Sequence, residues 1–87
     1  MTSKERAYLI KLSSNLSPVF QLGKEGFTPE VTKALLEVLE ARELIKINIL
    51  KNSPEDPKEV ARLIAERTSS ELVQVIGRKA VLYKPNK

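Results

Sequence analysis

The segment from Leu44 to Leu50 constrains the fold more than any other part of the chain. It reads Leu-Ile-Lys-Ile-Asn-Ile-Leu, with isoleucine at every second position. This period of two is typical of a strand with one buried face. The buried set is Ile45, Ile47 and Ile49, and the other face carries Lys46 and Asn48. Because such a strand needs partner strands and a covering layer, the chain is expected to fold around a sheet.

Two helices are predicted, one before and one after this strand in the sequence. Thr28-Pro29 and Asp56-Pro57 each place a capping side chain before a proline at the first helical position. Apolar periodicity then predicts helices from Pro29 to about Arg42 and from Pro57 to about Thr68. We expect these two helices to cover the isoleucine face of the sheet.

Shorter signals predict one more helix and three more strands. Thr2 and Glu5 have the spacing of a capping box, which predicts a helix over 3–14. Its apolar stripe would contain Leu9, Leu12 and Leu16. Strands are predicted over 19–22, 72–76 and 80–84, the last two joined by a Gly77-Arg78-Lys79 turn. The place of the first helix against the sheet stays open.

The element order αβαβαββ predicts an α/β (α+β) two-layer sandwich, with three helices and a mixed four-stranded sheet. A length of 87 residues suits one domain, spanning residues 1–87. No apolar run approaches the roughly 18–20 residues of a membrane span. The charged N-terminal residues lack the apolar core of a signal peptide. We therefore expect a cytoplasmic protein with no membrane partner.

The residue types that are missing exclude most catalytic chemistry. The chain has no cysteine, histidine or tryptophan. This removes thiol nucleophiles, histidine bases and thiolate or imidazole metal sites. Glu37, Glu40 and Glu43 could bind a metal in principle, but their spacing on a helix beside basic residues is typical of a salt-bridged solvent face. We expect no enzyme activity, no metal and no cofactor.

The charge balance favours a polyanionic partner. Lysine and arginine number 15 against 11 acidic residues, a net charge of +4. Residues 28–56 are net acidic, whereas residues 77–87 contain no acid and carry Arg78, Lys79, Lys84 and Lys87. Basic residues also occur on solvated turns and termini. The same alternative holds for the first helix, whose Lys4, Arg6 and Lys11 can serve solubility alone.

A glycine pair lies between the first strand and the second helix, in the loop Gly23-Lys24-Glu25-Gly26. Glycines let a phosphate approach the backbone, the following helix start carries unpaired N–H groups, and Lys24 adds a cation. GxxG loops clamp nucleic acid in KH domains. The alternative is a plain turn, and the acidic Glu25 opposes an anion. Without a lysine and serine of Walker type after the loop, nucleotide hydrolysis is not expected.

Aromatic residues are too few for a base-stacking platform. Phe20 and Phe27 flank the glycine loop but are expected in the core, and the other aromatics are Tyr8 and Tyr83. Proteins that read single strands need exposed aromatics. Recognition of backbone and shape therefore fits better.

Three motifs, taken in order, resemble the YhbY family of small bacterial CRM-domain proteins. They are Leu22–Thr28, Glu43–Ile47, and the closing pair Gln74–Arg78 and Val81–Pro85. The resemblance covers essentially the whole chain. It implies a fold similar to the C-terminal domain of translation initiation factor three, RNA binding, and association with precursors of the large ribosomal subunit.

The residues and the resemblance together predict an RNA-binding site made of Gly23, Lys24, Gly26, Lys46, Arg78, Lys79 and Lys84. The partner is expected to be structured large-subunit ribosomal RNA or its precursor particle, bound by a monomer that assists subunit assembly. The alternative is a protein-interaction domain that binds a ribosomal protein or an assembly factor, with the basic residues serving solubility.

Overall fold

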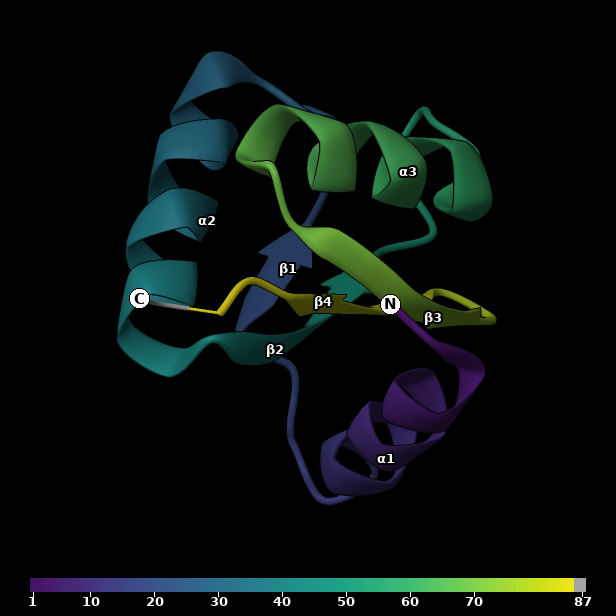
Figure 1. The fold of residues 1–87 in the computed structure, drawn as a ribbon. Helices are drawn as coiled ribbons and strands as arrows, with labels where there is room; N and C mark the ends of the chain where they lie inside the picture. Colours follow the sequence, from purple (N-terminus) through teal and green to yellow (C-terminus); the bar gives the residue numbers. More distant parts are fainter. Residues whose placement is uncertain (86–87) are drawn as a thin grey trace.

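Helices and strands follow one another in the predicted order, and Figure 1 shows their arrangement. The computed structural model describes residues 1–85, so Lys87 lies outside the described part. The elements are α1 (Ser3–Ser13), β1 (Phe20–Leu22), α2 (Pro29–Arg42), β2 (Leu44–Ile49), α3 (Pro57–Thr68), β3 (Glu71–Ile76) and β4 (Lys79–Tyr83). Their bounds lie within one residue of those predicted from the sequence.

All three helices begin at side chains that cap the first turn. The Thr2 hydroxyl accepts the Glu5 N–H, and the Glu5 carboxylate accepts the Thr2 N–H, which completes a capping box. These bonds, chiefly the one from the Thr2 backbone, lower the pKa of Glu5. Thr28 and Asp56 cap α2 and α3. Local sequence therefore sets where each helix begins.

The four strands form one mixed sheet in the order β1-β2-β4-β3. β1 runs parallel to β2, and β4 runs antiparallel to both of its neighbours. The carboxyl ends of β1, β2 and β3 and the amino end of β4 consequently lie at one end of the sheet. The loops that leave this end carry most of the predicted site.

α2 and α3 cover the isoleucine face of the sheet, as predicted. Ile45, Ile47 and Ile49 are at most 1% exposed. They pack in one cluster with the apolar sides of both helices, including Leu35, Leu39, Val60 and Ile64. Since burying each such side chain contributes about 1.5–3 kcal/mol, this cluster is the main source of stability.

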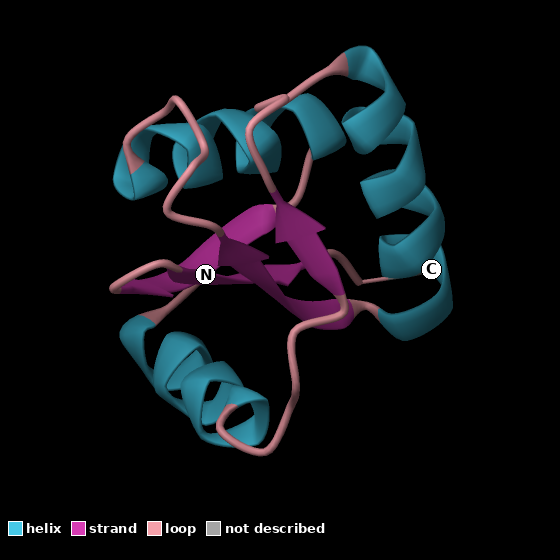
Figure 2. Cartoon of the chain, turned by 180° about the vertical axis from the view of Figure 1, so that it is seen from behind, coloured by secondary structure: helices cyan, strands magenta, loops and turns pink. Residues whose placement is uncertain are grey.

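α1 packs on the opposite face of the sheet, the position that the sequence left open (Figures 1 and 2). Leu9 belongs to a small second cluster with Val73 and Val81. The predicted stripe of α1 is wrong beyond Leu9, because Leu12 is 43% exposed and Leu16 is 37% exposed. The sheet with α2 and α3 forms the predicted sandwich, and α1 adds a partial third layer.

Arg6 fastens α1 to β3, which borders the sheet. Its Nη1 donates hydrogen bonds to the carbonyls of Leu72 (2.9 Å) and Val73 (2.6 Å). The strand register shifts between Leu72 and Gln74, which marks a β-bulge at this point. A bulge disrupts the ladder locally, so its carbonyls need other donors. Arg6 supplies one, and its side chain therefore has a structural role.

Candidate nucleic-acid interface

Three segments far apart in the sequence meet at the carboxyl end of β1 and β2. The strand register pairs Leu22 with Ile49 and Asn48 with Lys79, so residues 23–28, 50–56 and the 77–78 turn leave the sheet together. Figure 2 shows the first two loops running side by side in front of α3. Arg78 joins the hairpin to this group, since its Nη1 donates to the Leu50 carbonyl at 3.3 Å.

Gly26 shapes the glycine loop from inside the protein. Its N–H donates to the Gly23 carbonyl at 3.0 Å, and its φ is 72°. A side chain here would begin 2.8 Å from a Glu55 carboxylate oxygen. The Gly26 amide is thus engaged within the loop, and both the positive φ and the lack of room for a side chain favour glycine at this position.

The loop tip is the part of this segment that faces solvent. Lys24 and Glu25 are both exposed, whereas Gly23 is half-buried and Gly26 is buried. Within residues 1–85, the Lys24 ammonium has no ion-pair or hydrogen-bond partner. Lys24 therefore presents an exposed cation to an anion.

The hairpin places two further cations at the same end of the sheet as the loop. Arg78 and Lys79 are exposed, at the turn and at the first residue of β4. Lys51 is also exposed, directly after β2 in the neighbouring loop. Sequence analysis missed Lys51 because it lies in a net acidic stretch. The signal that could have found it is its place just after a strand that ends at this edge.

Lys46 lies apart from the loops but shares a surface with the hairpin. It is half-buried on the sheet face opposite α2 and α3. There it lines a depression of about 370 Å³ together with Arg78 and Lys79. The structure thus brings three of the predicted basic residues to one surface.

Lys84 does not join this group. It follows the far end of β4, where its Nζ donates to the Thr68 carbonyl at 2.8 Å. Thr68 is the last residue of α3, and a cation is stabilising at the carboxyl end of a helix. In this conformation Lys84 caps α3, and its ammonium is already bound.

A second cationic feature lies at the start of α2, directly after the glycine loop. Phe27, Thr28, Pro29 and Thr32 line a depression of about 290 Å³ with Arg67 of α3. The Thr28 side chain accepts the Val31 N–H at 3.3 Å. The Arg67 side chain is exposed and reaches this helix start.

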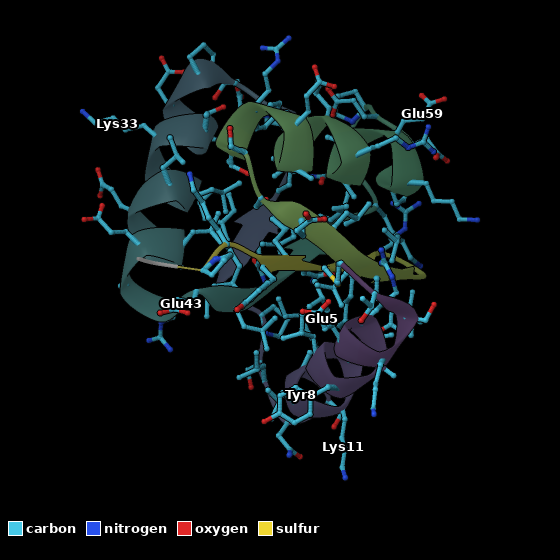
Figure 3. The ribbon with its side chains drawn as sticks, viewed as in Figure 1. Glu5, Tyr8, Lys11, Lys33, Glu43 and Glu59 are labelled. Carbon is cyan, nitrogen blue, oxygen red and sulfur yellow. The ribbon has the colours of Figure 1, made fainter. Side chains whose placement is uncertain are left out.

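The two phenylalanines beside the loop belong to the core, as predicted. Phe20 and Phe27 are half-buried and pack against the main cluster. Figure 3 shows Tyr8 on α1 directed away from the sheet, and this ring is 62% exposed. Tyr8 lies on a different part of the molecule from the cationic loops.

Within residues 1–85, no helix has the length and apolar character to cross a membrane. In the same residues, no group of three acidic, histidine or cysteine side chains is placed to hold a metal ion.

The fold and this surface define a small α+β binding domain with cations gathered at one end of its sheet. The chain belongs to the CRS1/YhbY (CRM) domain family, whose model matches residues 1–84. This agrees with the resemblance found in the sequence motifs.

Two named relatives and a solved structure match nearly all of the chain. A Bacillus subtilis protein named "Probable RNA-binding protein YqeI" is 42% identical over 87 residues, covering 100% of this chain and 91% of the relative. A Haemophilus influenzae "RNA-binding protein" is 31% identical, covering 99% of this chain and 87% of its own. The solution structure of Staphylococcus aureus SAV1595 superimposes with a TM-score of 0.85 at 45% identity, covering 100% of this chain and 91% of that one.

Proposed function

We propose that this protein is an RNA-binding domain, spanning residues 1–87, that docks on structured ribosomal RNA and assists assembly of the large subunit. The relatives named as RNA-binding proteins support RNA as the partner. The observation that carries the proposal is the meeting of Lys24, Lys51, Arg78 and Lys79, from three separate segments, at one end of the sheet. An RNA backbone laid across this end would contact all three segments.

The proposed mechanism is contact with phosphates, without bond making or breaking. Lysine and arginine neutralise phosphates and release counterions, so binding weakens as salt rises. Such contacts fix position and orientation, not sequence. The start of α2 with Arg67 offers another anion contact beside the loop. The protein would act as a cytoplasmic monomer, with no cofactor and no catalytic step.

Within this proposal the predicted residues divide into two groups. Lys24, Lys46, Arg78 and Lys79 contact RNA directly, whereas Gly23 and Gly26 hold the loop that presents Lys24. Lys84 would contact RNA only after leaving the Thr68 carbonyl. Its main contribution is therefore to the end of α3.

The salt dependence of binding to a fragment of large-subunit ribosomal RNA tests the proposal. If about four phosphates are neutralised, the logarithm of the affinity falls with the logarithm of the salt concentration at a slope of about −3 to −4. Lys24→Ala should weaken binding to all sequences of the fragment and make the slope shallower by about one unit. Fluorescence anisotropy over a potassium chloride series measures both quantities.

Lys33→Ala is the matched control. Lys33 is an exposed lysine that points outward from α2, away from the hairpin (Figure 3). Its loss should leave the slope unchanged. Equal effects of the two substitutions would show that only net charge matters. If Lys24→Ala leaves both the affinity and the slope unchanged, the loop is not part of the interface. Absence of RNA binding, together with salt-insensitive retention of a protein partner, would favour the protein-interaction alternative.

A further inference from the structure

Part of the sheet face opposite α2 and α3 is left open by α1. Two rows of side chains cross β2, β4 and β3 there. The strand register places Lys46, Val81 and Gln74 in one row. The next row consists of Asn48, Lys79 and Ile76. These six residues, with Gly77 and Arg78 of the turn, line the depression of about 370 Å³.

The bulge in β3 places the polar side chain of Gln74 on this face. Because Val73 is the extra residue between the paired positions Leu72 and Gln74, Val73 and Gln74 both lie on the α1 side of the sheet. Val73 is covered by α1, while Gln74 remains half-buried in the depression. Two amide side chains, Asn48 and Gln74, therefore lie on one face with β4 between them.

These two amides have no partner inside the protein. Among residues 1–85, neither the Asn48 nor the Gln74 side chain makes a hydrogen bond to another protein group. An amide carries both donors and an acceptor, and it matches the hydrogen-bonding edge of a base. Because both amide side chains are half-buried, only a ligand that enters the depression can reach them.

The rest of the lining suits a nucleotide rather than a peptide or an apolar ligand. Lys46, Arg78 and Lys79 provide three cations, and none of the lining residues, all within the described chain, is acidic. Val81 is buried at the floor and Ile76, at the rim, is 64% exposed. A base needs this combination, because it has an apolar face, a polar edge and an adjoining phosphate. The volume lies near the lower end of the range of about 300–1,000 Å³ for small-ligand sites.

From these observations we infer that the depression holds one unpaired nucleotide of the bound RNA. Asn48 and Gln74 contact the edge of its base, Ile76 packs on the base, and Lys79 and Arg78 contact the flanking phosphates. Paired RNA hides these edges in a groove that side chains cannot enter, whereas a bulged base can swing out. The inference rests on the proposed function, and it adds a point of base recognition to a surface that otherwise contacts phosphates.

Two stem-loop RNAs test this inference at one fixed salt concentration. They are identical except that one carries a single bulged nucleotide, made in four versions for the four bases. Wild-type protein should bind the best bulged RNA about ten-fold more tightly than the paired stem. The double variant Asn48→Ala/Gln74→Ala should lose this preference and keep its affinity for the paired stem.

Two controls separate this site from the phosphate contacts. Asn15→Ala removes an exposed amide outside the depression and should keep the preference for the bulged RNA. Lys24→Ala should weaken binding to both RNAs by the same factor. As a readout that needs no substitution, the side-chain NH₂ resonances of Asn48 and Gln74 in the wild type should shift with bulged RNA and stay unchanged with the paired stem.

The outcomes distinguish the two proposals. If the wild type binds both RNAs equally and the amide resonances do not move, the nucleotide site is overturned while RNA binding stands. A double variant that loses affinity equally for both RNAs overturns it as well, because the amides then act on the surface in general. If neither RNA is bound, the proposed function fails first.

Discussion

At the scale of single residues, the two glycines of the loop have different roles. A Cβ added at Gly23 would lie at an ordinary distance of 3.8 Å from the nearest side-chain atom, whereas Gly26 has a positive φ and a Cβ added there would lie only 2.8 Å from a Glu55 carboxylate oxygen. Gly77 has a φ of 58° but open space around it. Strain from a new side chain should therefore differ at the three positions.

The loss in free energy of unfolding caused by alanine should increase in the order Gly23, Gly77, Gly26. Gly23→Ala should change the free energy of unfolding by less than about 1 kcal/mol. Gly77→Ala should cost about 1–2 kcal/mol for the left-handed backbone alone. Gly26→Ala should cost more than Gly77→Ala, because the Glu55 carboxylate and Pro54 must also move. Urea unfolding measures all three, and equal losses at Gly26 and Gly77 would show that Glu55 and Pro54 do not crowd a side chain at position 26.

Sequence alone predicts the glycine loop but not this division of roles. The spacing of Gly23 and Gly26 indicates a turn before a capped helix, and the turn is present. What covers Gly26 is the segment Pro54-Glu55, which the sheet topology brings against it. Such a contact between distant segments leaves no local pattern.

At the scale of helices and strands, local chemistry was sufficient for most of the fold. Thr2, Thr28 and Asp56 cap the helices that were expected to begin after them. The bulge in β3 could not be predicted, since strict alternation over 72–76 would put Val73 and Gln74 on opposite faces. The face of the sheet on which α1 packs could not be predicted either. Arg6 anchors α1 by binding carbonyls at the bulge, and the bulge itself was not predictable.

Arg6→Ala should loosen α1 from the sheet. The side chain donates to the Leu72 and Val73 carbonyls, and hydrogen bonds from charged donors contribute about 1.5–3 kcal/mol, less where exposed. We expect a loss of about 1–2 kcal/mol in the free energy of unfolding, together with faster amide hydrogen exchange in α1. Lys11→Ala, at an exposed basic residue of the same helix, should do neither. Similar losses in the two variants would mean that Arg6 acts only through charge.

At the scale of the whole molecule, topology decides which basic residues lie at the same end of the sheet. Lys79 and Lys84 are close in sequence, but a strand advances about 3.4 Å per residue, so they lie at opposite ends of β4. Lys24 and Arg78, far apart in sequence, lie at the same end. Charge counting could predict a basic surface, but it could not separate Lys84 from that surface.

Replacing isoleucine by valine should affect stability differently on the two faces of the sheet. Ile47 is 0% exposed and Ile76 is 64% exposed. Ile47→Val should lower the free energy of unfolding by about 1 kcal/mol, and Tm by about 4–8 °C, because it leaves a cavity under α2 and α3. Ile76→Val should change stability by less than about 0.5 kcal/mol. Thermal unfolding followed by circular dichroism checks both, and a comparable fall for Ile76→Val would place that side chain in the core.

The borders of the sheet bear on how this protein behaves when it is concentrated. Unpaired backbone along an exposed strand can recruit the same strand of another molecule and start fibril growth. Here one border is β1, three residues long, and the other is β3, whose bulge carbonyls are occupied by Arg6. Neither border presents a long straight template, so the fold carries its own protection against polymerisation.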